Sequence, residues 1–114
     1  MTTMYGIKNC DTVKKARQWL DKHAITYHFH DFRVEGLTSD KIQQWLQTQP
    51  LEKLVNKQST TWKQLTDDEK ASLTIDSAIA LCLQHPTLIK RPVLEYDGAI
   101  HLGFKETHYQ SLFQ

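Results

Sequence analysis

Glycine and long apolar runs are scarce in this chain, and each scarcity excludes a class of function. Four glycines occur in 114 residues, and Gly6 and Gly36 stand alone, so no glycine-rich phosphate loop is present. No apolar run approaches the roughly 20 residues that a membrane-spanning helix needs. Residues 1–5 lack the basic and apolar parts of a signal peptide, which predicts a cytoplasmic protein that does not act on a membrane.

An excess of charge of either sign is also missing. The formal net charge is +1, with 39% hydrophobic and 24% charged residues, which is ordinary for a soluble globular protein. So small a net charge argues against nucleic acid as a partner, because nucleic-acid binding needs a strongly basic face. Residues 1–114 have the length of a single compact domain, and no repeat, low-complexity tract or linker divides them.

The chain has only two cysteines, Cys10 and Cys82, and they differ in their surroundings. Cys82 lies in an apolar run, where a small buried hydrophobic residue is expected. Two distant cysteines in a reducing compartment seldom form a structural disulfide, and they lack the paired spacing of a zinc site. His28 and His30 are spaced as on a strand but have no cysteine nearby in sequence, so no metal site is predicted.

The first third of the chain predicts a strand, a helix and a second strand. Residues 3–7 form a short apolar strand, and apolar residues recur at helical spacing from about residue 12 to residue 23. The second strand is expected at 25–32, where Ile25, Tyr27 and Phe29 alternate with polar neighbours. Such a unit has parallel strands joined by a right-handed crossover.

The middle of the chain, from about 37 to 85, predicts only helices. Thr38 or Ser39 caps a helix that Pro50 ends, and a short helical piece follows at 51–55. Because this block contains no strand pattern, we expect it to be an insertion between the two halves of a sheet.

The second part of this helical block begins with a polar stretch, 56–61, that is expected to form a loop. Acidic residues after Thr66 then predict the first turn of another helix. A last helix is expected to begin at Asp76 or Ser77 and to end before Pro86. Its predicted inward residues are Ile79, Cys82 and Leu83.

The end of the chain returns to strands. Residues 92–96 and 99–102 flank Asp97 and Gly98, a strong signal for a two-residue hairpin because both positions tolerate positive φ. A closing helix is expected at 105–113, with His108 or Tyr109 and with Leu112 facing the sheet.

Without the helical block, the order of elements is βαβ followed by ββα, which is the arrangement of the thioredoxin fold. The predicted fold class is therefore α/β: a thioredoxin-like fold with a mixed four-stranded sheet and an all-helical insertion at about 37–85.

Cys10 lies where the first strand meets the first helix, the position of the active thiol in that fold. Unpaired amides and the positive end of the helix dipole at this point favour the thiolate, which attacks disulfides, oxidised sulfur and oxyanions. Lys8 and Lys14 add positive charge nearby. The backbone N–H groups expected to face the sulfur or an oxyanion belong to Asn9, Asp11 and Thr12.

The residue three positions after Cys10 is Val13, so the chain lacks the C-x-x-C motif of dithiol enzymes. Valine cannot resolve a mixed disulfide. Any redox chemistry of Cys10 therefore needs an external thiol or Cys82.

A second candidate group is Lys90-Arg91-Pro92, just before the third strand. A cis-proline is expected here in a thioredoxin-like domain and would bring its neighbours opposite the active thiol. Arg91 would then be a fixed cation near Cys10, able to bind a carboxylate or oxyanion in a bidentate way. The alternative is that Lys90 and Arg91 form only a solvated basic patch.

Basic residues could also form a rim that binds an anionic tripeptide such as glutathione. The candidates are Lys8, Lys14, Lys15, Arg17, Lys90 and Arg91. For Lys15 and Arg17, a solvated helix face is the favoured alternative.

Six segments together resemble the arsenate reductase (ArsC)/Spx family, and most closely its YffB-type members. They cover nearly the whole chain in the expected order: 5–12, 14–16, 30–33, 60–63, 89–92 and 102–104. The resemblance implies a thioredoxin-like domain with a helical insertion, a nucleophilic cysteine at Cys10 with Arg91 beside it, and glutathione or a similar thiol as reductant.

Two departures from the family pattern bear on function. Arsenate reductases of this type carry two further arginines around the oxyanion, and those positions here hold Asn56 and a residue near Phe104. An arsenate ion would therefore lose much of its stabilising charge. Regulators of the Spx type carry C-x-x-C at the first site and act by binding RNA polymerase, and Val13 removes that redox switch.

We therefore expect a glutathione-dependent monothiol oxidoreductase with Cys10 and Arg91 as catalytic residues. The alternatives are an arsenate reductase-like enzyme and a non-catalytic, Spx-like interaction module that docks through the helical insertion. No bound cofactor is expected; the partners are glutathione as co-substrate and an unidentified oxidised substrate, and we expect a monomer. The predicted substrate-binding residues are Lys8, Asn9, Asp11, Thr12, Lys14, Lys90 and Pro92.

Overall fold

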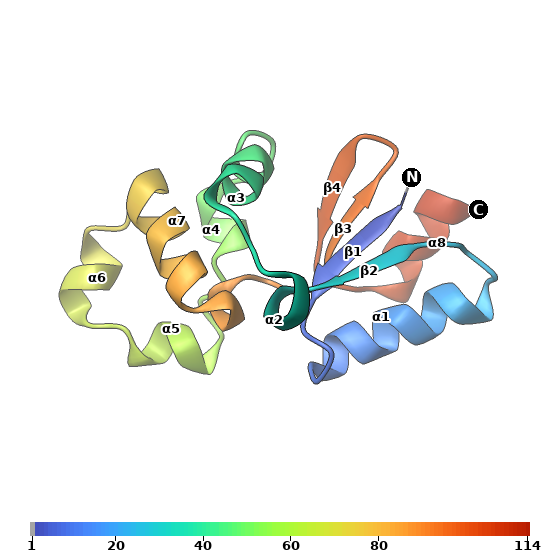
Figure 1. Ribbon diagram of the computed structural model, residues 1–114, viewed down its shortest axis with the longest axis horizontal. Helices are drawn as coiled ribbons and strands as arrows, with labels where there is room; N and C mark the ends of the chain where they lie inside the picture. Colours follow the sequence, from blue (N-terminus) through green and yellow to red (C-terminus); the bar gives the residue numbers. More distant parts are fainter. Residues whose placement is uncertain (1) are drawn as a thin grey trace. The chain divides into compact units, whose positions relative to one another are not determined.

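The structure is a computed structural model that describes residues 2–114. Its elements group into two compact units (Figure 1). The first unit runs to Gly36 and resumes at Arg91–Gln114, and the second is Leu37–Lys90. The helical block predicted at about 37–85 falls within this second unit, which extends five residues further, to residue 90.

The first unit contains a mixed four-stranded sheet. Its strands are β1 (Thr3–Gly6), β2 (His28–Asp31), β3 (Val93–Tyr96) and β4 (Ala99–Leu102), in the order β2-β1-β3-β4. β1 pairs in parallel with β2 and antiparallel with β3, and β3 and β4 form an antiparallel hairpin. At the tip of that hairpin, Asp97 and Gly98 have φ values of 53° and 77°, as predicted from the sequence.

Two helices, α1 (Asp11–Lys22) and α8 (Glu106–Phe113), pack on one face of this sheet. Apolar residues at helical spacing on α1 form its buried side, because a stripe of this kind must be removed from water. The core between helices and sheet consists of Met4, Val13, Ala16, Trp19, Leu20, Leu94 and Tyr109. Tyr109, rather than the exposed His108, is thus the residue of α8 that faces the sheet.

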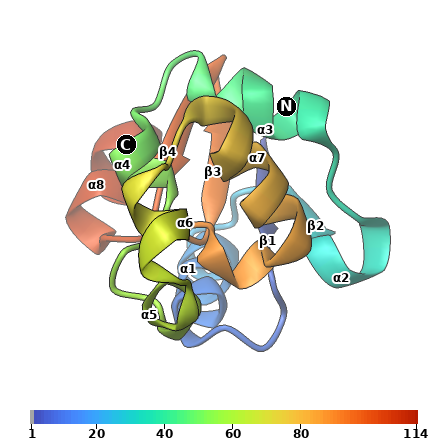
Figure 2. The ribbon, with the colours of Figure 1, turned by 90° about the vertical axis from the view of Figure 1, so that its left-hand side faces the viewer.

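The second unit is helical, and Figure 2 shows it facing the viewer. Its elements are α3 (Ser39–Leu46), α4 (Leu51–Leu54), α5 (Thr60–Gln64), α6 (Asp67–Ala71), α7 (Ile75–Gln84) and the 3-10 turn η1 (Pro86–Leu88). Helices α3 and α7 pack against each other. Hydroxyl side chains that accept a backbone N–H begin four of these helices, at Thr38, Ser59, Thr66 and Thr74.

The arrangement confirms the predicted α/β, thioredoxin-like fold with a helical insertion, and it corrects several local expectations. The second strand begins at His28 rather than at residue 25, and it ends at Asp31, where the chain turns into a helical turn, α2 (Phe32–Glu35). The Asp31 carboxylate accepts the Arg33 amide at 2.8 Å and so starts that turn. In the predicted loop 56–61, Ser59 caps α5 in the same way.

The last helix of the second unit also differs from its prediction. It begins at Ile75 after the cap Thr74, one residue earlier than expected, and Leu83 on it is 38% exposed. Cys82 is buried as predicted, together with Ala78 and Leu81, whereas Ile79 is half-buried. No helix within residues 2–114 has both the length and the apolar character that crossing a bilayer requires.

Candidate active site around Cys10

Cys10 is the cap residue of α1, as its place in the sequence predicted. Its amide donates to the Ile7 carbonyl at 3.1 Å, which closes the turn after β1, and its carbonyl accepts the Lys14 amide at 2.9 Å. Within residues 2–114 the Cys10 side chain makes no capping hydrogen bond to α1. The first amides of a helix have no intrahelical acceptor, so the start of α1 next to Cys10 is able to bind an anion.

The thiol is free and partly exposed, and it also touches the core of the first unit. This position combines access for a small reactant with a packed, water-poor side. Reactive cysteines generally occupy partly exposed positions, whereas structural cysteines are buried.

A close contact between β1 and α1 fixes where this cysteine lies. A Cβ atom on Gly6 would come within 2.8 Å of Val13 Cγ2, so only glycine fits without displacement. Val13 is completely buried. The residue three positions after Cys10 is therefore part of the core.

The predicted substrate-binding residues of this loop and first turn are all exposed: Lys8, Asn9, Asp11, Thr12 and Lys14. The loop is tied to the end of β2, because the Lys8 amide donates to the Asp31 carboxylate at 3.3 Å. The Lys8 and Cys10 amides thus both make hydrogen bonds that hold the backbone of the loop, while its side chains stay exposed.

The predicted cis bond is present between Arg91 and Pro92. Pro92 is buried, and its carbonyl accepts the Gly103 amide at 2.9 Å. Tyr5 of β1 pairs with Val93 of the antiparallel strand β3. Pro92 and Arg91, which precede Val93, therefore lie near the end of β1 from which the chain runs to Cys10. The fold thus brings Arg91 and the Cys10 loop to the same edge of the sheet.

Lys90 belongs to the other unit, where its amide donates to the Leu54 carbonyl at 2.8 Å and its side chain is exposed. Arg17 does not join a basic rim. It donates to the Tyr27 hydroxyl at 3.1 Å, and its guanidinium lies 4.1 Å from the centre of the Phe29 ring. Arg17 therefore packs α1 onto the β2 side of the unit.

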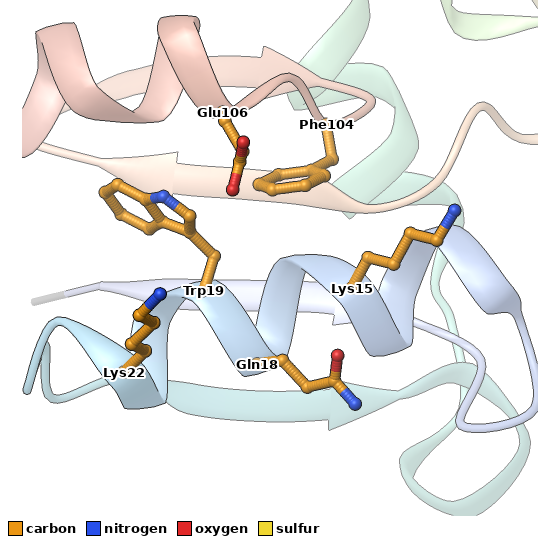
Figure 3. Close-up of a pocket in the computed structure, with 6 residues that line it drawn as sticks. All are labelled: Lys15, Gln18, Trp19, Lys22, Phe104 and Glu106. Carbon is orange, nitrogen blue, oxygen red and sulfur yellow. The ribbon is translucent and has the colours of Figure 1, made fainter.

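A cavity of about 430 Å³ lies along α1 (Figure 3). It is lined by Lys15, Gln18, Trp19, Lys22, Phe104 and Glu106. Lys15, Gln18 and Lys22 follow helical spacing and could have been grouped from the sequence, since residues three and seven apart share a face. Phe104 and Glu106 lie about 85 residues away in the chain, so only the fold brings them here.

Cys82, the second cysteine, cannot take part from the position it occupies. It is completely buried on α7, and burial raises the pKa of its thiol to about 12. A protonated, inaccessible thiol neither attacks nor resolves a disulfide.

A separate group of side chains meets where β2 runs into α2. His28, His30 and Glu35 place one ligand atom each within 4.8 Å of one another. Sequence reasoning looked for cysteine partners of these histidines and missed the carboxylate, which the unpredicted turn α2 supplies.

The chain is similar to known proteins over nearly its whole length. The profile of the ArsC family matches residues 5–112. An uncharacterized protein of Haemophilus influenzae is 47% identical over 113 residues, covering 99% of each chain. The global transcriptional regulator Spx of Lactiplantibacillus plantarum is 27% identical over 108 residues, covering 93% of this chain and 81% of the regulator.

Solved structures show the same similarity. A YffB protein superposes with a TM-score of 0.95 at 39% identity, covering 100% of both chains. An arsenate reductase (ArsC) related protein from Brucella melitensis superposes with a TM-score of 0.81 at 46% identity, covering 99% of this chain and 94% of that protein.

Proposed function

Since this chain belongs to the ArsC family, we propose that it is a glutathione-dependent monothiol oxidoreductase with Cys10 as its nucleophile. One observation carries the proposal: Cys10 occupies the N-cap position of α1 with a free, partly exposed thiol. Within residues 2–114 this thiol makes no hydrogen bond to the first amides of the helix. The amides of Asp11, Thr12 and Val13 then stabilise the thiolate that attacks, or an oxyanion of the substrate.

The reaction proceeds in three thiol–disulfide exchanges. The Cys10 thiolate attacks one sulfur of an oxidised substrate, forming a mixed disulfide and releasing the other sulfur as a thiolate that takes up a proton. A glutathione thiolate next attacks the substrate sulfur of that mixed disulfide and releases the Cys10 thiolate. A second glutathione reduces the glutathione–substrate disulfide, so that two glutathione thiols supply the two electrons and leave as glutathione disulfide.

An external thiol is needed because neither internal alternative is available. The position three residues after Cys10 holds buried Val13, and Cys82 is buried with its pKa raised to about 12. A free thiol as nucleophile also fits a reducing compartment such as the cytoplasm, where glutathione is abundant.

Arg91 binds an anionic group of the substrate or of glutathione. The pairing of Tyr5 with Val93 supports this role, because Arg91 comes two residues before Val93 and so lies near the end of β1 from which the Cys10 loop starts. A guanidinium holds a carboxylate through two parallel hydrogen bonds, which a lysine cannot do. Lys8, Asn9, Lys14 and Pro92 complete the proposed substrate contacts within the first unit.

The cavity along α1 offers a place for the rest of a bound glutathione. It begins at Lys15, five residues after Cys10, which is about 7.5 Å along a helix axis and within the reach of an extended tripeptide. Lys15 and Lys22 match its two carboxylates, and Glu106 matches its ammonium group. Trp19 and Phe104 supply apolar contact between these charges (Figure 3).

An arsenate reductase-like activity is the second enzymatic candidate, and the similarity to an ArsC-related protein favours it. Phe104, near one of the positions where such reductases carry a further arginine, lines an apolar part of the cavity instead. A non-catalytic regulator is the third candidate, favoured by the similarity to Spx.

The proposal is tested by trapping and turnover. Purified protein is incubated with glutathione disulfide and the adduct is located by mass spectrometry, and turnover is measured with a glutathionylated peptide and glutathione as reductant. Wild-type protein is expected to carry one glutathione on Cys10 and to turn over, whereas Cys10→Ser should do neither and Cys82→Ala should do both.

Arg91 is tested with a matched pair of variants. Arg91→Ala and Arg91→Lys should both raise KM for glutathione or substrate, with the smaller effect in Arg91→Lys because it keeps the charge but loses the bidentate contact.

Turnover that survives in Cys10→Ser would refute the proposal. Inactivity of the wild-type protein together with capture of a protein partner by both wild type and Cys10→Ser would favour the regulator.

A further inference from the structure

The junction of β2 and α2 carries three side chains whose chemistry the proposed reductase does not use. His28 and His30 lie two residues apart on β2, so both point to the same side of the strand, and neighbouring Phe29 packs against the core below α1. Glu35 comes from the turn α2 directly after the strand. One carboxylate oxygen lies 3.4 Å from His28 Nε2 and the other 3.9 Å from His30 Nδ1.

The hydrogen bond of His30 fixes which of its ring nitrogens is available. His30 Nε2 lies 2.7 Å from the Gly36 carbonyl oxygen, and because a carbonyl only accepts, Nε2 carries the proton. In the neutral ring the lone pair is then on Nδ1, which faces the Glu35 carboxylate. Two electron-rich atoms face each other there, an arrangement that a cation between them makes favourable.

The backbone holds this arrangement in place. Gly36 ends α2 with φ +82°, a conformation that other residues adopt at a cost, and its amide donates to the Phe32 carbonyl at 3.1 Å. The His30 ring also lies against Tyr5, with ring centres 4.7 Å apart. A carbonyl that receives the second ring nitrogen of a histidine is the usual support for a metal ligand, since it sets tautomer and orientation.

The spacing of the ligand atoms suits a small divalent ion. In a tetrahedral zinc site with bonds of about 2.0–2.1 Å, ligand atoms lie roughly 3.3 Å apart. The His28–Glu35 distance of 3.4 Å already matches, and all three ligand atoms lie within 4.8 Å, so side-chain rotation closes the remainder. Two histidines and one carboxylate are a donor set that zinc and other late first-row ions accept.

We propose that His28, His30 and Glu35 form a binding site for a divalent transition-metal ion, with zinc as the best match. Three protein ligands leave the fourth tetrahedral position to water or to an external ligand. Access is open, since the side chains of His28 and Glu35 are 57% and 40% exposed. A proton on His30 Nδ1 would also remove the repulsion between this nitrogen and the Glu35 carboxylate, so the metal ion competes with protons for the site.

The test titrates tag-free, metal-stripped protein with zinc chloride by calorimetry. One zinc per chain is expected for wild type, for Cys10→Ser and for His108→Gln. His108 is the matched control, because its Nε2 lies 3.1 Å from His101 Nδ1. Within residues 2–114 this histidine pair has no third metal-ligating side chain close enough to complete a site. His28→Gln and Glu35→Gln should each weaken binding by at least about 100-fold, since even loss of a supporting partner costs 10–100-fold.

A second measurement on the wild-type protein guards against variants that misfold. Zinc-induced changes in amide resonances should centre on residues 28–36. Equal affinity in Glu35→Gln, loss of binding in Cys10→Ser or His108→Gln, resonance changes centred elsewhere, or no saturable binding would each overturn the site. These outcomes are independent of turnover at Cys10, so either proposal can fail without the other.

Discussion

Gly6→Ala is the substitution whose effect follows most directly from the geometry of the Cys10 site. The new Cβ atom would lie 2.8 Å from Val13 Cγ2 and 3.3 Å from Val13 Cγ1, distances that force a shift. Val13 is completely buried and β-branched, so it has no free rotamer to move into. The strand and the helix must separate instead, and overpacking of this kind costs about 1–3 kcal/mol of unfolding free energy.

The assay is urea unfolding followed by both circular dichroism and tryptophan fluorescence, so that a loss of two-state behaviour is detected. For a chain of this length, each kcal/mol should lower Tm by about 3–6 °C. Because Val13 lies three residues after Cys10, the same shift should change the rate at which iodoacetamide alkylates Cys10.

A double-mutant cycle with Val13→Ala isolates the contact. Val13→Ala alone should be destabilising because it leaves a cavity. In the double variant both close contacts are gone, and the alanine at position 6 keeps only an ordinary contact with Phe29 Cε1 at 3.7 Å. The double variant should therefore be more stable than the sum of the single effects by about 1 kcal/mol or more. A Gly6→Ala variant within about 0.5 kcal/mol of wild type, or strictly additive effects, would refute the reasoning.

Three further predictions concern stability. Tyr109→Phe is expected to raise the unfolding free energy by about 1 kcal/mol, because the buried Tyr109 hydroxyl has no hydrogen-bond partner among residues 2–114; a marked loss of stability in urea would contradict this. Burial raises the pKa of Cys82 from 9.0 to about 12, so the unfolded chain loses that proton first. The unfolding free energy should then fall as pH rises from about 9 to about 12, by up to about 1.4 kcal/mol per unit, and Cys82→Ala should reduce this slope. Gly98→Ala should cost about 1 kcal/mol because φ is +77° there, and an unchanged Tm would show that the hairpin tip relaxes freely.

Elements with a local cause were predictable from the sequence. The alternation of apolar residues with charged ones along α1, the cap Thr38 of α3 and the turn pair Asp97 and Gly98 each act within a few residues, and each is found where expected. The place of Cys10 between strand and helix belongs to this class, because it depends only on where β1 ends and α1 begins.

The missed elements are short and depend on one side-chain hydrogen bond each. The turn α2 begins where the Asp31 carboxylate accepts the Arg33 amide, and this ends the strand before Phe32. Helix α5 starts at the Ser59 hydroxyl in a polar stretch without apolar periodicity. On α7 the sequence correctly predicts that Cys82 is buried, but Leu81 rather than Leu83 is buried beside it, since a run of consecutive apolar residues does not fix the phase of a helix.

Sequence by itself determined the order of the strands and of the longer helices, the α/β class and the cysteine at the start of α1, since these follow from patterns spanning a few residues. Only the tertiary structure decided which distant groups meet: Phe104 and Glu106 beside α1, Arg91 at the end of β1, and Glu35 between two histidines. The reason is that strand pairing and helix packing join residues far apart in the chain. Which side chains then share one surface depends on the register of every element at once.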